Sequence, residues 1–179
     1  GSLPNPMRWD SVIQGSLAYG YGMAVTPLHL AQAYATLAND GRRVNARLIQ
    51  GVSSGETGMQ VVSAASAQAV MKMMQTVVQP GGTATRAKLD WYSVAGKTGT
   101  THQVGASGYE DAKYVSSFVG ITPAVNPRIV TVVVINEPPD DAYYGGEVAA
   151  PVFKGIMEQA MPLLNIRPDS SPLASAGSY

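Results

Sequence analysis

Lys97-Thr98-Gly99-Thr100 stands directly after the apolar-leaning Val94-Ala95-Gly96, within the part of the sequence that decides the fold. The segments 92–101, 114–122 and 128–136 are rich in Val, Ile, Thr and aromatic residues, which favour strands. The linkers between these segments are too short to hold crossover helices, so the strands are predicted to pair antiparallel. We therefore expect an α/β fold (α+β) in which helices flank an antiparallel sheet.

Two helices are predicted before the strands. Thr26 is a candidate N-cap ahead of Pro27, and apolar residues then recur at helical spacing until Asn39-Asp40-Gly41 ends the helix. The second helix is expected to begin near Ser63 and to stop at Pro80-Gly81-Gly82. Its core-filling face is expected to consist of Val70, Met73, Met74 and Val77.

The remaining predicted elements lie around this framework. Residues 130–135 are almost wholly apolar, which indicates a strand that helices cover on both faces. A final helix is predicted over residues 148–164, with Pro151 tolerated only in its first turn. Residues 47–52 are predicted to form a short strand, and residues 51–58 a hairpin or loop.

The amino-acid composition argues against several classes of function. The chain has 179 residues, of which 45% are hydrophobic, and twelve basic residues balance twelve acidic ones. Only 13% are charged, against roughly 25% in an average soluble domain, and no basic run is present, which argues against a nucleic-acid partner. Cysteine is absent and the two histidines have no metal-site spacing, so no metal or cofactor is expected. No apolar run reaches the roughly 18 residues of a membrane span.

The candidate chemistry lies on the first predicted strand. Lys97 provides a cation for a substrate carboxylate, and Gly99 leaves space where another segment or the substrate backbone must come close. Thr98 and Thr100 fall on one side of the strand, where both hydroxyls can serve one anion. Backbone N–H groups on an exposed strand edge could also hold the oxyanion of an acyl transfer. Lys-Thr-Gly is typical of penicillin-binding proteins and serine β-lactamases.

Longer segments around this motif resemble the class B penicillin-binding proteins. The resemblance extends from about Pro6 to Asp169 and is closest to the division-specific peptidoglycan D,D-transpeptidases. It implies the penicillin-binding transpeptidase fold, with residues 3–169 as the C-terminal half of that domain. Independently of the resemblance, the dipeptide Gly1-Ser2 is typical of an expression scar, and the small, polar residues 170–179 predict a flexible tail. The segments that carry the resemblance are 20–27, 30–34, 37–41, 80–84, 114–120, 132–138, 143–146 and 149–153.

The resemblance implies a serine acyl transfer in septal cell-wall cross-linking. In that family, an active-site serine is acylated by the penultimate D-Ala of a peptidoglycan stem peptide, and a neighbouring stem then takes the acyl group. β-Lactams mimic the D-Ala-D-Ala ligand. The implied partners also include membrane proteins of the division complex, among them the glycosyltransferase that polymerises lipid II. The implied location is the periplasmic face of the bacterial inner membrane, with an anchoring helix upstream of this chain.

The resemblance also implies residue roles. Lys97, Thr98, Gly99 and Thr100 would form the catalytic strand, which binds the carboxylate of substrate or drug and lines the oxyanion site.

Aromatic and basic residues complete the implied site. Tyr21, Tyr143 and Tyr144 resemble the aromatic wall around bound β-lactams, although packing beside glycine turns explains them equally well. Many relatives carry an arginine shortly after the motif, where this sequence has Thr101-His102. The second cation would then be a protonated His102 or Lys113, and the alternative is that His102 is a surface residue.

One part of the family's machinery is missing from these residues. The chain contains neither the Ser-x-x-Lys arrangement, which provides the nucleophile and its base, nor Ser-x-Asn. Both are expected upstream of Gly1, so the isolated chain is predicted to be inactive. The alternative is a non-catalytic module that binds or senses peptidoglycan or β-lactams. A hydrolytic serine β-lactamase is a third possibility.

Overall fold

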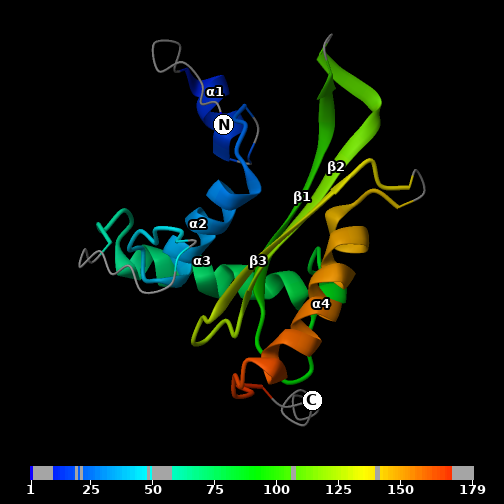
Figure 1. Cartoon of the computed structure of the whole chain (residues 1–179). Coiled ribbons are helices and arrows are strands. Elements are labelled where there is room, and N and C mark those ends of the chain that lie inside the picture. Colours follow the sequence, from blue (N-terminus) through cyan, green and yellow to red (C-terminus); the bar gives the residue numbers. More distant parts are fainter. Residues whose placement is uncertain are drawn as a thin grey trace.

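The computed structural model describes residues 1, 10–18, 20, 22–47, 49, 58–105, 108–139 and 142–170, with side chains left out for 104–112. Its elements follow the order helices, strands, helix (Figure 1). Short 3-10 turns at Gln75–Val78 (η2) and Thr85–Ala87 (η3) connect the helical part to the sheet. The helices are α1 (Ser11–Ala18), α2 (Pro27–Ala38), α3 (Ala64–Met74) and α4 (Gly145–Leu163), and the strands are β1 (Ala95–Gly105), β2 (Gly108–Thr122) and β3 (Ile129–Asn136).

The three strands form one antiparallel sheet in the order β1-β2-β3, as the sequence predicts. The register places Thr98 opposite Phe118 and Phe118 opposite Val133. β1 begins at Ala95, three residues later than expected, and continues to Gly105, so β1 and β2 form a longer hairpin than the composition indicates. Within the described residues, β1 has no partner on its outer edge.

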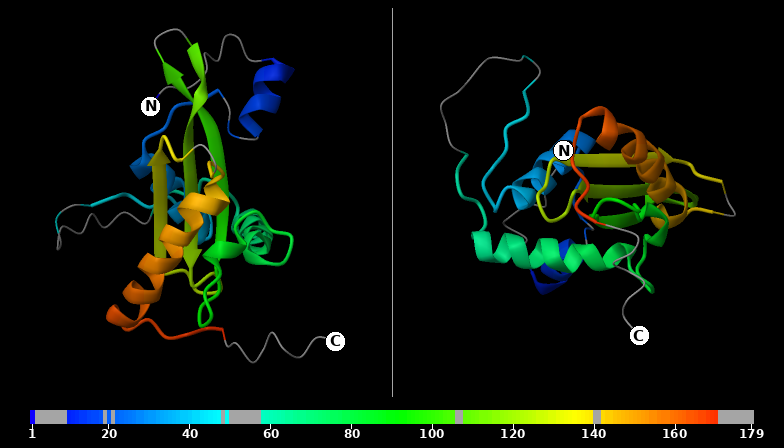
Figure 2. Two further views of the ribbon diagram at one scale, coloured as in Figure 1. Left: turned by 90° about the vertical axis from the view of Figure 1, so that its right-hand side faces the viewer. Right: turned by 90° about the horizontal axis from the view of Figure 1, so that it is seen from below.

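Helices cover both faces of the sheet, as predicted from the apolar segment 130–135 (Figure 2). On one face, α4 packs its buried residues Phe153, Met157 and Met161 against a core that includes Phe118 and Val133. On the other face, α2 and α3 pack against a smaller core. That second core contains Met71, Ala95, Ile121 and Ala124, with Tyr34, Leu37, Ala38, Met74 and Val130 at its margin.

Two aromatic rings join α4 to the sheet. Phe118 and Phe153 are fully buried and meet edge to face, with ring centroids 5.1 Å apart. A Cβ at Gly120 would lie 2.2 Å from the Phe153 ring, so glycine is required there for α4 to approach the strands. Burial of each ring contributes about 1.5–3 kcal/mol, which makes this contact a main attachment of α4.

Local capping explains why α2 and α3 begin where the sequence predicts. Thr26 Oγ1 accepts a hydrogen bond from the His29 N–H, and Pro27 occupies the first helical position. The predicted end of α2 is also confirmed, because Gly41 has a φ of 78°, which glycine adopts without steric cost. In α3, Ser63 Oγ accepts from the Ser66 N–H.

Two predictions about the helices are wrong. Met73 is 63% exposed, because α3 buries Ala67 and Met71 instead, and Met74 lies at the margin of the second core. Pro151 is the seventh residue of α4 and not part of its first turn, because the helix begins at Gly145.

Other predictions fall partly or wholly on residues that the structure does not describe. Of the strand predicted over 47–52, the structure describes only Arg47 and Ile49, and neither is in a strand. The predicted loop 51–58 lies outside them apart from Gly58. The same holds for the tail 170–179 apart from Ser170, and for Ser2 of the possible expression scar.

Candidate active site

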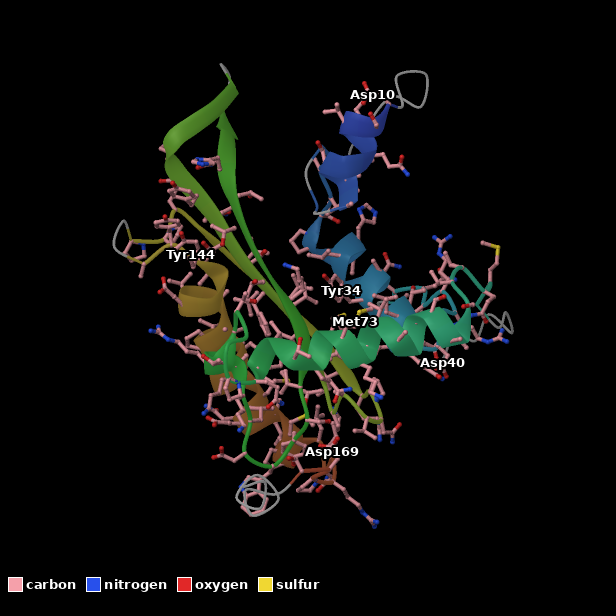
Figure 3. The ribbon with its side chains drawn as sticks, turned by 180° about the vertical axis from the view of Figure 1, so that it is seen from behind. Asp10, Tyr34, Asp40, Met73, Tyr144 and Asp169 are labelled. Carbon is pink, nitrogen blue, oxygen red and sulfur yellow. The ribbon has the colours of Figure 1, made fainter. Side chains whose placement is uncertain are left out.

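The edge strand β1, the first turn of α4 and the loop that carries η3 meet at a cavity of about 410 Å³. All three elements contribute polar groups to its lining, and Figure 3 shows the labelled Tyr144 where α4 begins. The other end of α4 lies far away, near Asp169 (Figure 3). The cavity is lined by Thr83, Thr85, Arg86, Thr98, Thr100, Tyr144, Gly145, Gly146 and Glu147.

Thr98 and Thr100 lie together in this cavity, as strand alternation predicts. The backbone N–H of Gly145 donates to Thr100 Oγ1 at 3.1 Å. Gly145 is the first residue of α4, so its N–H has no acceptor inside the helix and is free to make this bond. Because Thr100 Oγ1 already accepts a hydrogen bond from the protein, its own proton remains available to a ligand.

Thr98 is coupled to the loop in a similar way. Its Oγ1 lies 3.1 Å from Thr83 Oγ1, and either hydroxyl can be the donor. When a ligand accepts the proton of Thr98, Thr83 must be the donor to Thr98. Both strand hydroxyls then accept from the protein and donate to the ligand, an arrangement that suits a group with acceptors only, such as a carboxylate.

Glycines allow the backbone of α4 to contact the strand directly. A Cβ at Gly145 would lie 2.3 Å from the carbonyl oxygen of Ser117 and 2.6 Å from that of Gly99. A Cβ at Gly146 would lie 1.9 Å from the carbonyl oxygen of Thr83. Gly99 itself faces Ser117, whose Oγ would lie 2.5 Å from an added Cβ. The predicted close approach at Gly99 is therefore a contact with β2.

Lys97 does not line the cavity with the two threonines. Strand alternation places its side chain on the opposite face of β1, where it is exposed, and its Nζ donates to the carbonyl oxygen of Thr98 at 2.8 Å. The four residues of the motif thus present a cation on one side of the edge strand and two hydroxyls on the other.

The aromatic residues beside the cavity form a row of rings. His102 and Tyr114 have ring centroids 4.6 Å apart, Tyr114 stacks on Tyr143 at 4.2 Å, and Tyr143 is 4.5 Å from Tyr144. Buried Ser116 holds the row in place, because its Oγ donates to the carbonyl oxygen of Tyr143. Of these rings, Tyr144 reaches the cavity.

The tyrosine pair also has perturbed acid–base behaviour. The Tyr143 hydroxyl donates to that of Tyr144 at 3.3 Å. This hydrogen bond, together with repulsion between the two phenolates, raises the pKa of Tyr143 above its ordinary value of 10.0. The Tyr143 hydroxyl therefore stays protonated at neutral pH.

The structure does not bring the other predicted site residues into the cavity. His102 does not line it and packs on Tyr114, with its Nδ1 buried and without a hydrogen-bond partner. Lys113 forms a salt bridge with Glu137 at 3.6 Å. Tyr21 lies outside the described residues.

Sequence reasoning missed Thr83, Arg86 and Glu147 as lining residues. The segment 80–84 attracted notice only because it resembles the loop before the active-site strand of a known family. A signal was present in the pair Thr83 and Arg86, which lie shortly before the strand, but only the tertiary structure brings them to Thr98.

Two features are absent from the described part of the chain. It contains no cluster of three or more His, Asp or Glu side chains that could hold a metal ion. None of its helices combines the length and apolar character that crossing a membrane requires.

Comparisons with known proteins give one consistent family. The family described as penicillin binding protein transpeptidase domain matches residues 1–158. The chain is 35% identical over 178 residues to a probable peptidoglycan D,D-transpeptidase PenA of Neisseria flavescens, covering 99% of this chain and 44% of the relative. It is 39% identical over 172 residues to the peptidoglycan D,D-transpeptidase FtsI of Escherichia coli K12, and this match covers 95% of this chain and 29% of the relative.

A solved structure is similar as well. The apo transpeptidase domain of penicillin-binding protein 3 from Burkholderia pseudomallei matches with a TM-score of 0.85 and 36% identity. The match covers 94% of this chain and 51% of that chain. This chain therefore spans about half, or less, of the proteins that it resembles.

Proposed function

Because this chain belongs to the penicillin-binding protein transpeptidase family, we propose that it forms the carboxylate-binding side of a peptidoglycan D,D-transpeptidase. The observation that carries this proposal is the pair of threonine hydroxyls on β1, each of which can accept from the protein and donate into one cavity. The terminal carboxylate of a D-Ala-D-Ala stem peptide has only acceptors and fits such a pair.

The proposed reaction is an acyl transfer from D-Ala-D-Ala to a serine that these 179 residues do not supply. With the carboxylate held by Thr98 and Thr100, the scissile carbonyl lies along the outer edge of β1, where backbone N–H groups can stabilise the oxyanion. The serine oxygen bonds to the carbonyl carbon, the C–N bond breaks, and D-Ala leaves with a proton. The amine of a second stem then displaces the serine. Lys97, on the other face of β1, is proposed to assist the proton transfers at that serine.

β-Lactams are proposed to bind in the same place, because they carry an equivalent carboxylate beside a reactive amide. Tyr143, Tyr144 and Tyr21 are proposed as the aromatic wall of that site. The row of rings that Ser116 holds beside the cavity supports the assignment of the first two.

The biological setting is also proposed by relationship. Among the relatives, the Escherichia coli protein is named FtsI. A role in septal cross-linking at the periplasmic face of the inner membrane, beside division-complex proteins such as the lipid II-polymerising glycosyltransferase, is consistent with that relationship.

Labelling with a fluorescent penicillin tests the proposal. A longer protein in which this chain follows a Ser-x-x-Lys segment is expected to form a covalent adduct that survives denaturation, whereas the 179-residue chain is not. Replacing both Thr98 and Thr100 by valine in the longer protein should slow labelling strongly. Reversible binding without an adduct in the longer protein would support the non-catalytic binding module instead.

A further inference from the structure

We propose that Arg86 is the cation that recognises the ligand carboxylate in this protein, an inference that rests on the proposed function. A carboxylate held only by two neutral hydroxyls would lack a charge partner. None of the three predicted cations fills this place. Lys97 lies on the other face of β1, His102 packs on Tyr114 outside the cavity, and Lys113 pairs with Glu137. Among the described residues that line the cavity, Arg86 is the only cation.

The position of Arg86 is set by its neighbours in the loop. Ala84 is 1% exposed and Ala87 is 0% exposed. Both pack in the core that α4 also contributes to, and they fix η3 in place. Arg86 lies between them, exposed, and lines the same cavity as Thr98 and Thr100. The loop therefore brings a guanidinium to the cavity on a rigid base.

One further contact orients the guanidinium. Its Nη1 donates to the backbone carbonyl oxygen of Glu147 at 3.3 Å. A guanidinium has five N–H donors in a planar fork, so donors remain for a bidentate contact with a carboxylate. A lysine in this position would offer a point charge without that geometry.

Glu147 makes the inference more specific. Glu147 also lines the cavity, and it is an acidic residue in the first turn of α4, where the helix dipole favours one. The residues that line the cavity thus include one basic and one acidic residue. If Arg86 attracts the carboxylate of the ligand, Glu147 must oppose it, and neutralising each should have opposite effects on binding.

The test is a binding titration of the 179-residue chain, in which two-dimensional NMR monitors the backbone amide signals. The probes are N-acetyl-D-alanyl-D-alanine and the same dipeptide with its C-terminus amidated, which differ only in the charge that Arg86 would recognise. Arg86→Gln is expected to weaken binding of the acid by about tenfold or more, and to change binding of the amide less than twofold. Glu147→Gln should tighten binding of the acid.

Controls separate this effect from loss of structure and from failure of the proposed function. Lys88→Gln removes a nearby exposed cation that does not line the cavity, and it should leave binding of the acid within twofold. Equal affinity of the wild type and Arg86→Gln for the acid would overturn the inference, as would unchanged binding in Glu147→Gln. If the wild type does not bind the acid at Thr98 and Thr100, the proposed function fails and Arg86 loses its role with it.

Discussion

Replacing Gly145 by alanine should separate α4 from β1 and so test the contact on which the cavity depends. The new Cβ would lie 2.3 Å from one backbone carbonyl oxygen and 2.6 Å from another, whereas ordinary contacts begin near 3.4 Å. Because both obstacles are main chain, the start of α4 must move by roughly 1 Å. Overpacking of this kind costs about 1–3 kcal/mol. The movement also breaks the bond from the Gly145 N–H to Thr100 Oγ1, a further loss of about 0.5–1.5 kcal/mol.

Gly155→Ala is the matched control on the same helix. No atom lies within 4 Å of the added Cβ, and the position is exposed. Alanine there should stabilise the protein by about 0.5–1 kcal/mol, because glycine loses more backbone entropy on folding. Gly145→Ala gains the same entropic benefit, so the difference between the two variants isolates the steric cost.

Urea unfolding followed by circular dichroism measures both variants. The free energy of unfolding of Gly145→Ala should fall about 1.5–4.5 kcal/mol below that of Gly155→Ala. If the two variants are equally stable, α4 and β1 do not meet through their backbones in the way described, and the argument for an oriented Thr100 hydroxyl fails with it.

Two further predictions concern the hydroxyl groups of the site. Thr83→Val should weaken binding of N-acetyl-D-alanyl-D-alanine by about twofold to tenfold, because Thr98 loses its hydrogen-bond donor. Thr83→Ser keeps that donor and should bind the dipeptide normally. Equal binding by both variants would contradict the proposed chain of hydroxyl groups. The raised pKa of Tyr143 contributes stability that is fully present below pH 10.0 and is lost as the pH rises through the raised pKa. In Tyr144→Phe, the absorbance of the phenolate should show that Tyr143 ionises at lower pH. An unchanged titration would exclude Tyr144 as the cause of the raised pKa.

Local signals in the sequence were sufficient for part of the fold. The N-cap at Thr26 depends on a side chain that bonds to a backbone group three residues away, so the start of α2 is readable from the sequence. The strands were identified by their β-branched composition, and short linkers fixed their antiparallel order. The pairing of Thr98 with Thr100 followed from alternation along β1.

Features set by tertiary contact were not readable. The buried face of α3 differs from the predicted one at Met73, because the small Ala67 is buried and an apolarity pattern gives more weight to Met73, whereas Val77 is buried as predicted. The start of α4 at Gly145 depends on space beside β1, and the sequence pattern, which predicts a start at residue 148, does not encode that space. Arg86 reaches the cavity through the loop and α4, a relation that no local spacing encodes.

The contact between α4 and β1 also limits how this protein can diversify. Gly145 and Gly146 present main chain to the cavity, and the adjoining carbonyl groups belong to backbone as well. A mutation cannot give this wall new chemistry without displacing the helix. Tolerated changes in ligand preference should therefore collect at side chains of residues 83–86 and at Tyr144, while the glycine pair remains fixed.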